Sequence, residues 1–282
     1  MEWLKLTIRI PDDYQESFIA ELLDLDFGGF EQFDDKIEAY IPVERFNDVN
    51  REHIEQLLTY FPFEGHIEME QIIEQKNWNE AWEKTIEPQS IGAFFVRPTW
   101  SKAEVPAGLI PLEIDPKMAF GTGYHATTRL ILEMLPELDP SGKSVMDAGT
   151  GTGILAIASV KLGADHVLAF DIDEWSKINA RENALLNRVA GRIDFLLGGF
   201  EVIPENSRYD LILANINRNV IIGMMGEFRK FLAPDGRLCF SGILNTDVDE
   251  IIAKAGKHAM KVITRKDKGE WSMLLLAKNP DA

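Results

Sequence analysis

The chain is poor in cysteine: Cys239 is its single one among 282 residues. One cysteine cannot close an intrachain disulfide, and no cluster of cysteines and histidines suggests zinc or another metal. The surrounding GRLCFSGIL predicts a strand, so we expect Cys239 to be core and not a nucleophile. This cysteine usage favours a reducing compartment, and we expect the cytoplasm.

The chain also lacks a long hydrophobic run. No apolar stretch reaches the roughly 18–20 residues that a membrane-spanning helix needs. The opening MEWLKLTIRIPDD has no basic region followed by an apolar one, so we expect no secretory signal and no membrane partner. With 45% hydrophobic residues and a length sufficient for two domains, the chain is expected to be globular and soluble.

Basic residues are scarce. There are 29 lysines and arginines against 46 aspartates and glutamates, which gives a formal charge of −17. Proteins that bind a phosphate backbone usually present a basic face, so we expect no direct nucleic-acid binding. A negative surface attracts a basic partner over a Debye length of about 8 Å. Solubility alone is the other interpretation of the charge.

Residues 1–72 carry the pattern of a small α+β domain. An alternating strand is followed by a helix, two short strands joined at Asp34 and Asp35, a second amphipathic helix and a last strand. The order β-α-β-β-α-β is that of the ferredoxin-like motif. The region has mostly acidic exposed positions and no catalytic constellation, so we predict that it docks the substrate.

Residues 73–90 predict a linker helix. Trp78 and Trp82 are four positions apart and would share one face of it, packed on the next domain or in contact with substrate. In residues 91–282 strands and helices alternate. This alternation predicts an α/β domain with a largely parallel sheet.

The stretch KSVMDAGTGTGILAIASVKLGADHVLAFDID, residues 143–173, predicts a strand, a glycine turn, a helix and a second strand. Gly149, Gly151 and Gly153 would let the backbone turn sharply and let a ligand approach its amides. Asp171 ends the second strand, where a carboxylate can accept two hydrogen bonds from a ribose diol. We therefore expect a ligand that contains a nucleoside.

Two kinds of nucleoside ligand are compatible with this spacing. Gly151, Gly153 and Ala156 fit the G-x-G-x-x-G/A pattern of dinucleotide-binding folds. However, Asp147 would repel a pyrophosphate and attract a cation, and Asn215, after the strand YDLILA, offers a carbonyl acceptor to an amine. S-adenosylmethionine (AdoMet) has a ribose, a sulfonium and an amino-acid tail but no phosphate, so it fits these features.

Four stretches resemble one known family. They are IDPKMAFGTGYHATT, VMDAGTGTGILAIASVKLGA, FDID and DLILANI, and they are similar to ribosomal-protein methyltransferases that modify the eleventh protein of the large ribosomal subunit. The likeness covers about residues 75–280. It implies a Rossmann-like, seven-stranded class I methyltransferase domain behind the ferredoxin-like domain. It also implies AdoMet-dependent N-methylation (EC 2.1.1) of lysine or N-terminal amines of that basic protein.

The resemblance also implies the site residues. By position, the cofactor-binding residues are Thr128, toward the methionine tail, Gly149, for close approach, Asp171, on the ribose hydroxyls, and Asn215, near the sulfonium. We expect Asn215 to be catalytic by orienting the incoming amine. Since the donor is already activated, orientation and desolvation are expected to suffice without a dedicated general base.

Two departures from the family pattern leave the choice of amine open. Tyr124 and Ala126 stand where the family commonly has threonine and proline, and NINRNV stands where it commonly has Asn-Ile-Leu-Ala. The second departure would put Arg218 beside the expected amine site.

Each site residue has a structural alternative. Thr128 could simply sit in a first helical turn, Asn215 and Asp173 could cap helices, and His125 could hydrogen-bond backbone instead of acting as a base. Asp147 could order the glycine loop or contact the ligand directly.

The function has alternatives as well. They are a methyltransferase acting on another protein, RNA or a small-molecule amine, a nicotinamide-dependent oxidoreductase, and a non-catalytic binding module. We expect a monomer.

Overall fold

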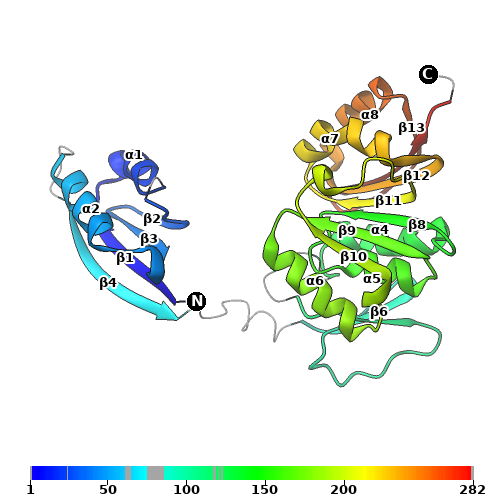
Figure 1. Ribbon diagram of the computed structural model, residues 1–282, viewed down its shortest axis with the longest axis horizontal. Coiled ribbons are helices and arrows are strands. Elements are labelled where there is room, and N and C mark those ends of the chain that lie inside the picture. The colour runs from blue at the N-terminus through cyan, green and yellow to red at the C-terminus, as the bar shows by residue number, and fades with distance from the viewer. Residues whose placement is uncertain are drawn as a thin grey trace. The chain divides into compact units, whose positions relative to one another are not determined.

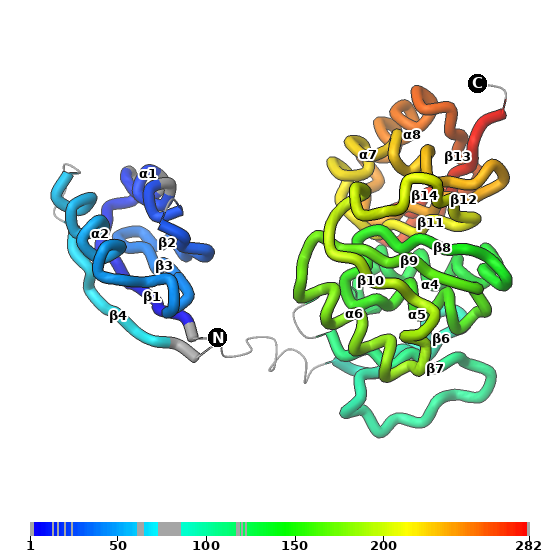
Figure 2. The backbone as a smooth tube through the Cα atoms, viewed as in Figure 1, coloured from blue at the N-terminus to red at the C-terminus, as the bar shows by residue number. Residues whose placement is uncertain are grey.

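The computed structural model describes residues 2–23, 25–60, 65–74, 86–116, 119, 121 and 123–280. The chain divides into two compact units, Met1–Glu80 and Ala81–Ala282. Figure 1 labels their helices and strands, and Figure 2 traces the backbone through each unit. Within the described ranges, none of the helices has the length and hydropathy required to cross a lipid bilayer.

The first unit is a four-stranded antiparallel sheet with two helices. Its strand order is β2-β3-β1-β4, so β1 lies between two strands that follow it in the chain. This order and the β-α-β-β-α-β succession confirm the predicted ferredoxin-like fold. The elements are β1 (Glu2–Arg9), α1 (Asp12–Leu23), β2 (Gly29–Phe33), β3 (Lys36–Pro42), the short η1 (Val43–Arg45), α2 (Asp48–Tyr60) and β4 (His66–Glu74).

Alternation along β1 builds the core of this unit. Leu6 and Ile8 are fully buried, as are Phe18 and Leu22 of α1. Successive side chains of a strand point to opposite faces, so Leu6 and Ile8 share the face that packs in this core, while Lys5 and Arg9 lie on the other. Arg9 at the end of β1 pairs with acidic side chains on both neighbouring segments.

The second unit contains the predicted seven-stranded sheet, in the order β10-β9-β8-β11-β12-β14-β13. β14 is antiparallel to both of its neighbours, and the other adjacent pairs are parallel, which confirms the expected largely parallel sheet. The elements are α4 (Ala126–Leu138), β8 (Ser144–Ala148), α5 (Ile154–Lys161), β9 (His166–Asp171), α6 (Glu174–Leu186), η2 (Ala190–Arg192), β10 (Ile193–Leu197), η3 (Phe200–Val202), β11 (Tyr209–Asn215), α7 (Arg218–Phe231), β12 (Leu232–Leu244), η4 (Asn245–Asp247), α8 (Val248–Lys257), β13 (Met260–Lys268) and β14 (Trp271–Lys278).

Helices cover both faces of this sheet. In β11, Leu211 and Leu213 join the core that α4, α5 and α6 complete, whereas the alternate Ile212 and Ala214 join the core of α7 and α8. A strand that is apolar on both faces is typical of a buried parallel sheet. Cys239 of β12 is fully buried, which confirms it as core, and burial raises the pKa of its thiol to about 12.

A three-stranded sheet precedes the main sheet and was not predicted. It consists of β5 (Gln89–Ile91), β6 (Phe94–Arg97) and β7 (Ile110–Glu113), in that order.

The predicted linker helix, residues 73–90, is wrong at its two ends, because β4 continues through Glu74 and β5 begins at Gln89. Backbone pairing with neighbouring strands outweighs local helical pattern at these ends. Residues 75–85, with Trp78 and Trp82, lie outside the described residues.

Phe228 offers a test of the α7–α8 face. Its ring is fully buried, with centroids 4.8 Å from Phe200 and 4.9 Å from Phe240. Phe228→Ala is expected to lower the free energy of unfolding of the second unit by about 3–5 kcal/mol in urea denaturation. Leu185→Ala, at a residue 61% exposed on α6, is expected to stay within about 0.5 kcal/mol of wild type. Equal effects of the two substitutions would contradict this account of the core.

Candidate active site at the carboxyl edge of the sheet

Three predicted site residues lie at the carboxyl ends of adjacent parallel strands. Gly149 directly follows β8, Asp171 ends β9, and Asn215 ends β11. The strand order reverses between β8 and β11, because β9 and β10 lie to one side and β12 to the other. Ligands of open α/β sheets bind outside the carboxyl ends of strands at this kind of switch point.

Gly149 has a conformation and a contact that require glycine. Its φ of +72° lies in the left-handed region, and a Cβ would come within 2.5 Å of Ile216 Cγ2. The amides of Gly149 and Thr150 both donate to the Phe170 carbonyl, at 2.9 and 3.0 Å. These bonds connect the start of the glycine loop to the end of β9, next to Asp171.

Asp147, in β8, orders the glycine loop that follows this strand. It is fully buried, and its Oδ2 accepts hydrogen bonds from Thr150 Oγ1 at 2.7 Å and from the Ala156 amide at 3.2 Å. The sequence left two roles open for Asp147, and these bonds agree with the first of them, which is to order the glycine loop. Its other oxygen, Oδ1, is buried and has no hydrogen-bond partner among the described residues. A buried carboxylate oxygen without a donor is costly, so this atom fits a ligand that brings an N–H group.

Asp171 has two local contacts. Its Oδ2 accepts from the Gly151 amide at 2.9 Å, and its Oδ1 accepts from the Asp173 amide at 3.1 Å. Each carboxylate oxygen can accept more than one hydrogen bond, so both retain capacity for ribose hydroxyls. Asp173 caps α6 by accepting from the Ser176 amide at 2.9 Å, in agreement with its structural alternative.

The structure brings Thr128 and Asn215 together from segments 87 positions apart. Asn215 Nδ2 donates to Thr128 Oγ1 at 3.0 Å, and Thr128 is fully buried in the first turn of α4. Asn217, not Asn215, caps α7, because its Oδ1 accepts from the Val220 amide. Asn215 Oδ1 is buried without a partner among the described residues. The Asn215 side chain therefore presents an acceptor at the edge of the sheet.

His125 has a structural role as the cap of α4. Its Nδ1 accepts from the Thr127 amide at 3.4 Å and lies 2.8 Å from Thr127 Oγ1. The ring also packs edge-on against Trp271, with centroids 4.8 Å apart. Nothing in the sequence pattern indicated that Trp271, at the start of β14, would reach this helix end.

Arg218 is engaged by acidic side chains of the following segments. It pairs with Glu250, and its Nε lies 3.7 Å from Asp247 Oδ1. These partners belong to η4 and α8, and the expected place of Arg218 beside the amine site stays a prediction. The stretch IDPKMAFGTGYHATT, residues 114–128, is described only in part, since Lys117, Met118, Phe120 and Thr122 lie outside the described residues.

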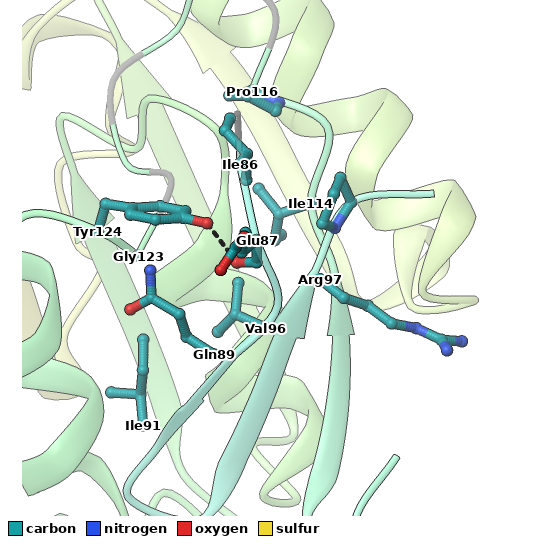
Figure 3. A pocket seen from close by; sticks show the side chains of 11 residues that line it. Ile86, Glu87, Gln89, Ile91, Val96, Arg97, Ile114, Pro116, Gly123 and Tyr124 are labelled. Carbon is teal, nitrogen blue, oxygen red and sulfur yellow. Dashed lines mark hydrogen bonds between the residues drawn. The ribbon is translucent and has the colours of Figure 1, made fainter. Parts of the chain in front are cut away.

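A small cavity lies between the three-stranded sheet and Tyr124. Figure 3 shows the Tyr124 hydroxyl directed at Glu87, to whose carbonyl it donates, while Arg97 points away from the cavity. Its volume is about 10 Å³, close to the minimum for one water molecule, and none of residues 149–153 lines it. It is therefore too small to hold a nucleoside.

The fold and the site together define the class of enzyme to which this protein belongs. The strand order with one reversed strand, the glycine loop bound to β9 and the carboxylate at the end of β9 are those of a class I methyltransferase, which uses AdoMet as its methyl donor. Asp147 and Asn215 fit this donor, since their unpaired buried oxygens are acceptors for amino groups.

Comparison with known proteins identifies the family. The family model "Ribosomal protein L11 methyltransferase (PrmA)" matches residues 2–279, so the chain belongs to this family. Enzymes of that name from Chlorobaculum parvum (39% identity over 86% of both chains) and Caldicellulosiruptor saccharolyticus (30% over 99% of this chain and 100% of the relative) are similar to it. The structure of a ribosomal protein L11 methylase from Lactobacillus delbrueckii subsp. bulgaricus is 29% identical, covers 68% of this chain and 99% of its own, and aligns with a TM-score of 0.64.

The buried Asp147 predicts a pH-dependent stability. Burial, aided by the charge of Asp171, raises the pKa of Asp147 to about 7, against about 3.9 in an unfolded chain. The folded state therefore binds the proton more tightly, and the stability that this gives is lost as the pH rises through about 7. Between pH 6 and pH 8, ligand-free wild type should lose about 1.4 kcal/mol relative to Asp147→Asn.

Urea denaturation at pH 6, 7 and 8 measures this difference. Asp235→Asn, at an exposed position, is the control and should follow wild type at each pH. Parallel pH profiles for wild type and Asp147→Asn would contradict the prediction.

Proposed function

We propose that this chain transfers methyl groups from AdoMet to lysine or N-terminal amines of ribosomal protein L11. Family membership supports the substrate, and the site supports the chemistry. The observation that carries the proposal is the pairing of Asn215 with Thr128 at the carboxyl edge of the sheet. This pairing leaves Asn215 Oδ1 buried and without a hydrogen-bond donor in the described part of the chain. A carbonyl oxygen in this state is suited to hold the N–H of an incoming amine.

We infer four cofactor-binding residues: Thr128, Gly149, Asp171 and Asn215. Thr128 would hold the methionine tail, the left-handed turn at Gly149 would allow close approach of the cofactor to the backbone, and Asp171 would accept from the ribose hydroxyls. Their places at one edge of the sheet and the remaining acceptor capacity of Asp171 support these roles. AdoMet supplies a methyl group already activated on a sulfonium.

The residues around the amine have two tasks, orientation and desolvation. A lysine amine with a pKa near 10.4 costs about 4–5 kcal/mol to deprotonate at pH 7, whereas an α-amino group with a pKa near 8 costs about 1.4 kcal/mol. Burial beside Asn215 lowers this cost, because it disfavours the charged form. His125 already accepts a hydrogen bond as a helix cap, which supports a mechanism without a dedicated base.

We also propose a division of labour, with residues 1–72 as the docking domain, residues 73–90 as the linker and residues 91–282 as the catalytic domain. Charge supports this division. The first 80 residues hold 20 acidic and six basic side chains, a formal charge of −14, while the remaining 202 hold 26 and 23, a charge of −3. A basic ribosomal protein would be attracted to the first unit.

Further proposals follow from this substrate. The chain would act in the cytoplasm as a monomer, without direct contact to nucleic acid. The alternative function is AdoMet-dependent methylation of another protein, RNA or a small-molecule amine. Mass spectrometry of L11 after incubation with enzyme and AdoMet separates the two: added methyl groups support L11 as substrate, and unchanged L11 favours the alternative.

Asn215 and His125 test the mechanism. Asn215→Ala removes the acceptor proposed for the amine and the bond to Thr128, so methyl transfer to L11 should fall by about 100-fold or more. His125→Ala removes a helix cap, which should cost about 1 kcal/mol of stability but less than about tenfold in turnover. The measurement is labelled-methyl incorporation. Loss of activity in His125→Ala with AdoMet binding intact would contradict the mechanism without a base.

Charge reversal tests the docking role. Glu52 and Glu55 are exposed on α2, where they line an open concavity of about 510 Å³. The double variant Glu52→Lys/Glu55→Lys should raise the KM for L11 about tenfold while the KM for AdoMet stays unchanged. Glu205→Lys/Asp235→Lys makes the same charge change at exposed positions of the second unit. Equal KM increases in both double variants would contradict docking by the first unit.

A further inference from the structure

Three buried asparagines form a stripe along α6 and its end. Asn179, Asn183 and Asn187 are four positions apart, and each is at most 5% exposed. Residues at this spacing share one face of a helix. Buried amides are costly unless they are paired, so their partners show what this face does.

All three asparagines pair with backbone at or just beyond the end of β7, and Asn179 Nδ2 donates to the Asp115 carbonyl at 2.9 Å. Asn187 accepts from the Glu113 amide at 3.1 Å and donates to the Glu113 carbonyl at 2.7 Å. Asn183 does the same with Asp115, at 3.0 and 3.3 Å. Four helical residues rise about 6 Å and two extended residues about 6.6 Å, so the amides of Asn187 and Asn183 match Glu113, the last residue of β7, and Asp115, two positions beyond it. β7 is an edge strand, which leaves this backbone available.

Asn183 also contacts Asn179 Oδ1, at 3.3 Å, and makes a bond to the glycine loop. Its Nδ2 donates to the Thr152 carbonyl at 2.9 Å. Thr152 is fully buried, and its hydroxyl donates to the Gly121 carbonyl at 2.6 Å. Gly121 lies seven positions before Thr128. Asn187 has no hydrogen bond to residues 149–153 among those of the described residues.

We propose that Asn183 is a positioning residue for the AdoMet site. It fixes Thr152 and, through the Thr152 hydroxyl, joins the glycine loop to the segment that leads into α4. The cofactor loop is then held from three sides, by β9, by α6 and by the chain before α4. The proposal rests on the AdoMet-binding function proposed above and adds a residue that touches neither cofactor nor substrate.

Matched asparagine variants test the proposal. Asn183→Ala and Asn187→Ala each remove one paired amide on the same helical face, so both should lower the melting temperature to a similar extent. Isothermal calorimetry with S-adenosylhomocysteine, well below both melting temperatures, should show affinity reduced about tenfold or more in Asn183→Ala and within about twofold of wild type in Asn187→Ala. Equal losses in the two variants, or wild-type affinity in Asn183→Ala, would overturn the proposal.

A second pair of variants covers the case in which Asn183→Ala does not fold. Thr152→Val keeps the size of the side chain and removes the bond to Gly121, while Thr152→Ser keeps the hydroxyl. Weakened binding in Thr152→Val with recovery in Thr152→Ser is expected, and equal binding by both overturns the link. Wild-type protein that binds no S-adenosylhomocysteine would instead refute AdoMet binding itself.

Discussion

The site depends on how the backbone of residues 149–153 is held. A chain in left-handed conformation, as at Gly149, is not stabilised by a helix or a strand, so other groups must fix it. Here carboxylates and a carbonyl do so: Asp147 binds Thr150, Asp171 binds the Gly151 amide, and the end of β9 accepts from the first two loop amides. Because these anchors come from two adjacent strands, the register of the sheet sets the geometry of the loop.

One of these anchors, the buried Asp147, also relates the glycine loop to ligand binding. Asp147 Oδ1 has no hydrogen-bond donor among the described residues, and burial raises the pKa of this carboxyl group. A ligand with an ammonium group would supply the missing donor and favour the charged carboxylate. Ligand binding and folding are then linked, since a group that binds only the folded state stabilises it. A buried carboxylate oxygen normally has a hydrogen-bond donor, and exceptions of this kind are expected at functional sites. At Asp147 a bound ligand would supply that donor.

Much of the site was predictable because strand ends are local features. A glycine turn after β8, Asp171 after β9 and Asn215 after β11 can each be placed from nearby residues, and parallel pairing then brings them to one edge. The contacts that the sequence did not indicate join distant segments. Asn183 meets Asp115 across 68 positions, Arg218 meets Glu250 across 32, and the three-stranded sheet depends on pairing of short strands. Asparagine at four-residue spacing is visible in the sequence, but its partners are not.

The two units would contribute differently to substrate recognition: the first would attract a basic protein, and the second would select the amine on it. The charge of −14 on the first 80 residues acts over several ångströms and is screened by salt, so it favours a basic protein without selecting one amine on it. Selection of the amine needs short-range contacts, and the buried Asn215 oxygen offers one. Since a lysine is about 3 kcal/mol harder to neutralise than an α-amine, the walls of the site must exclude water more completely for lysine. Docking charge therefore cannot replace desolvation of the amine.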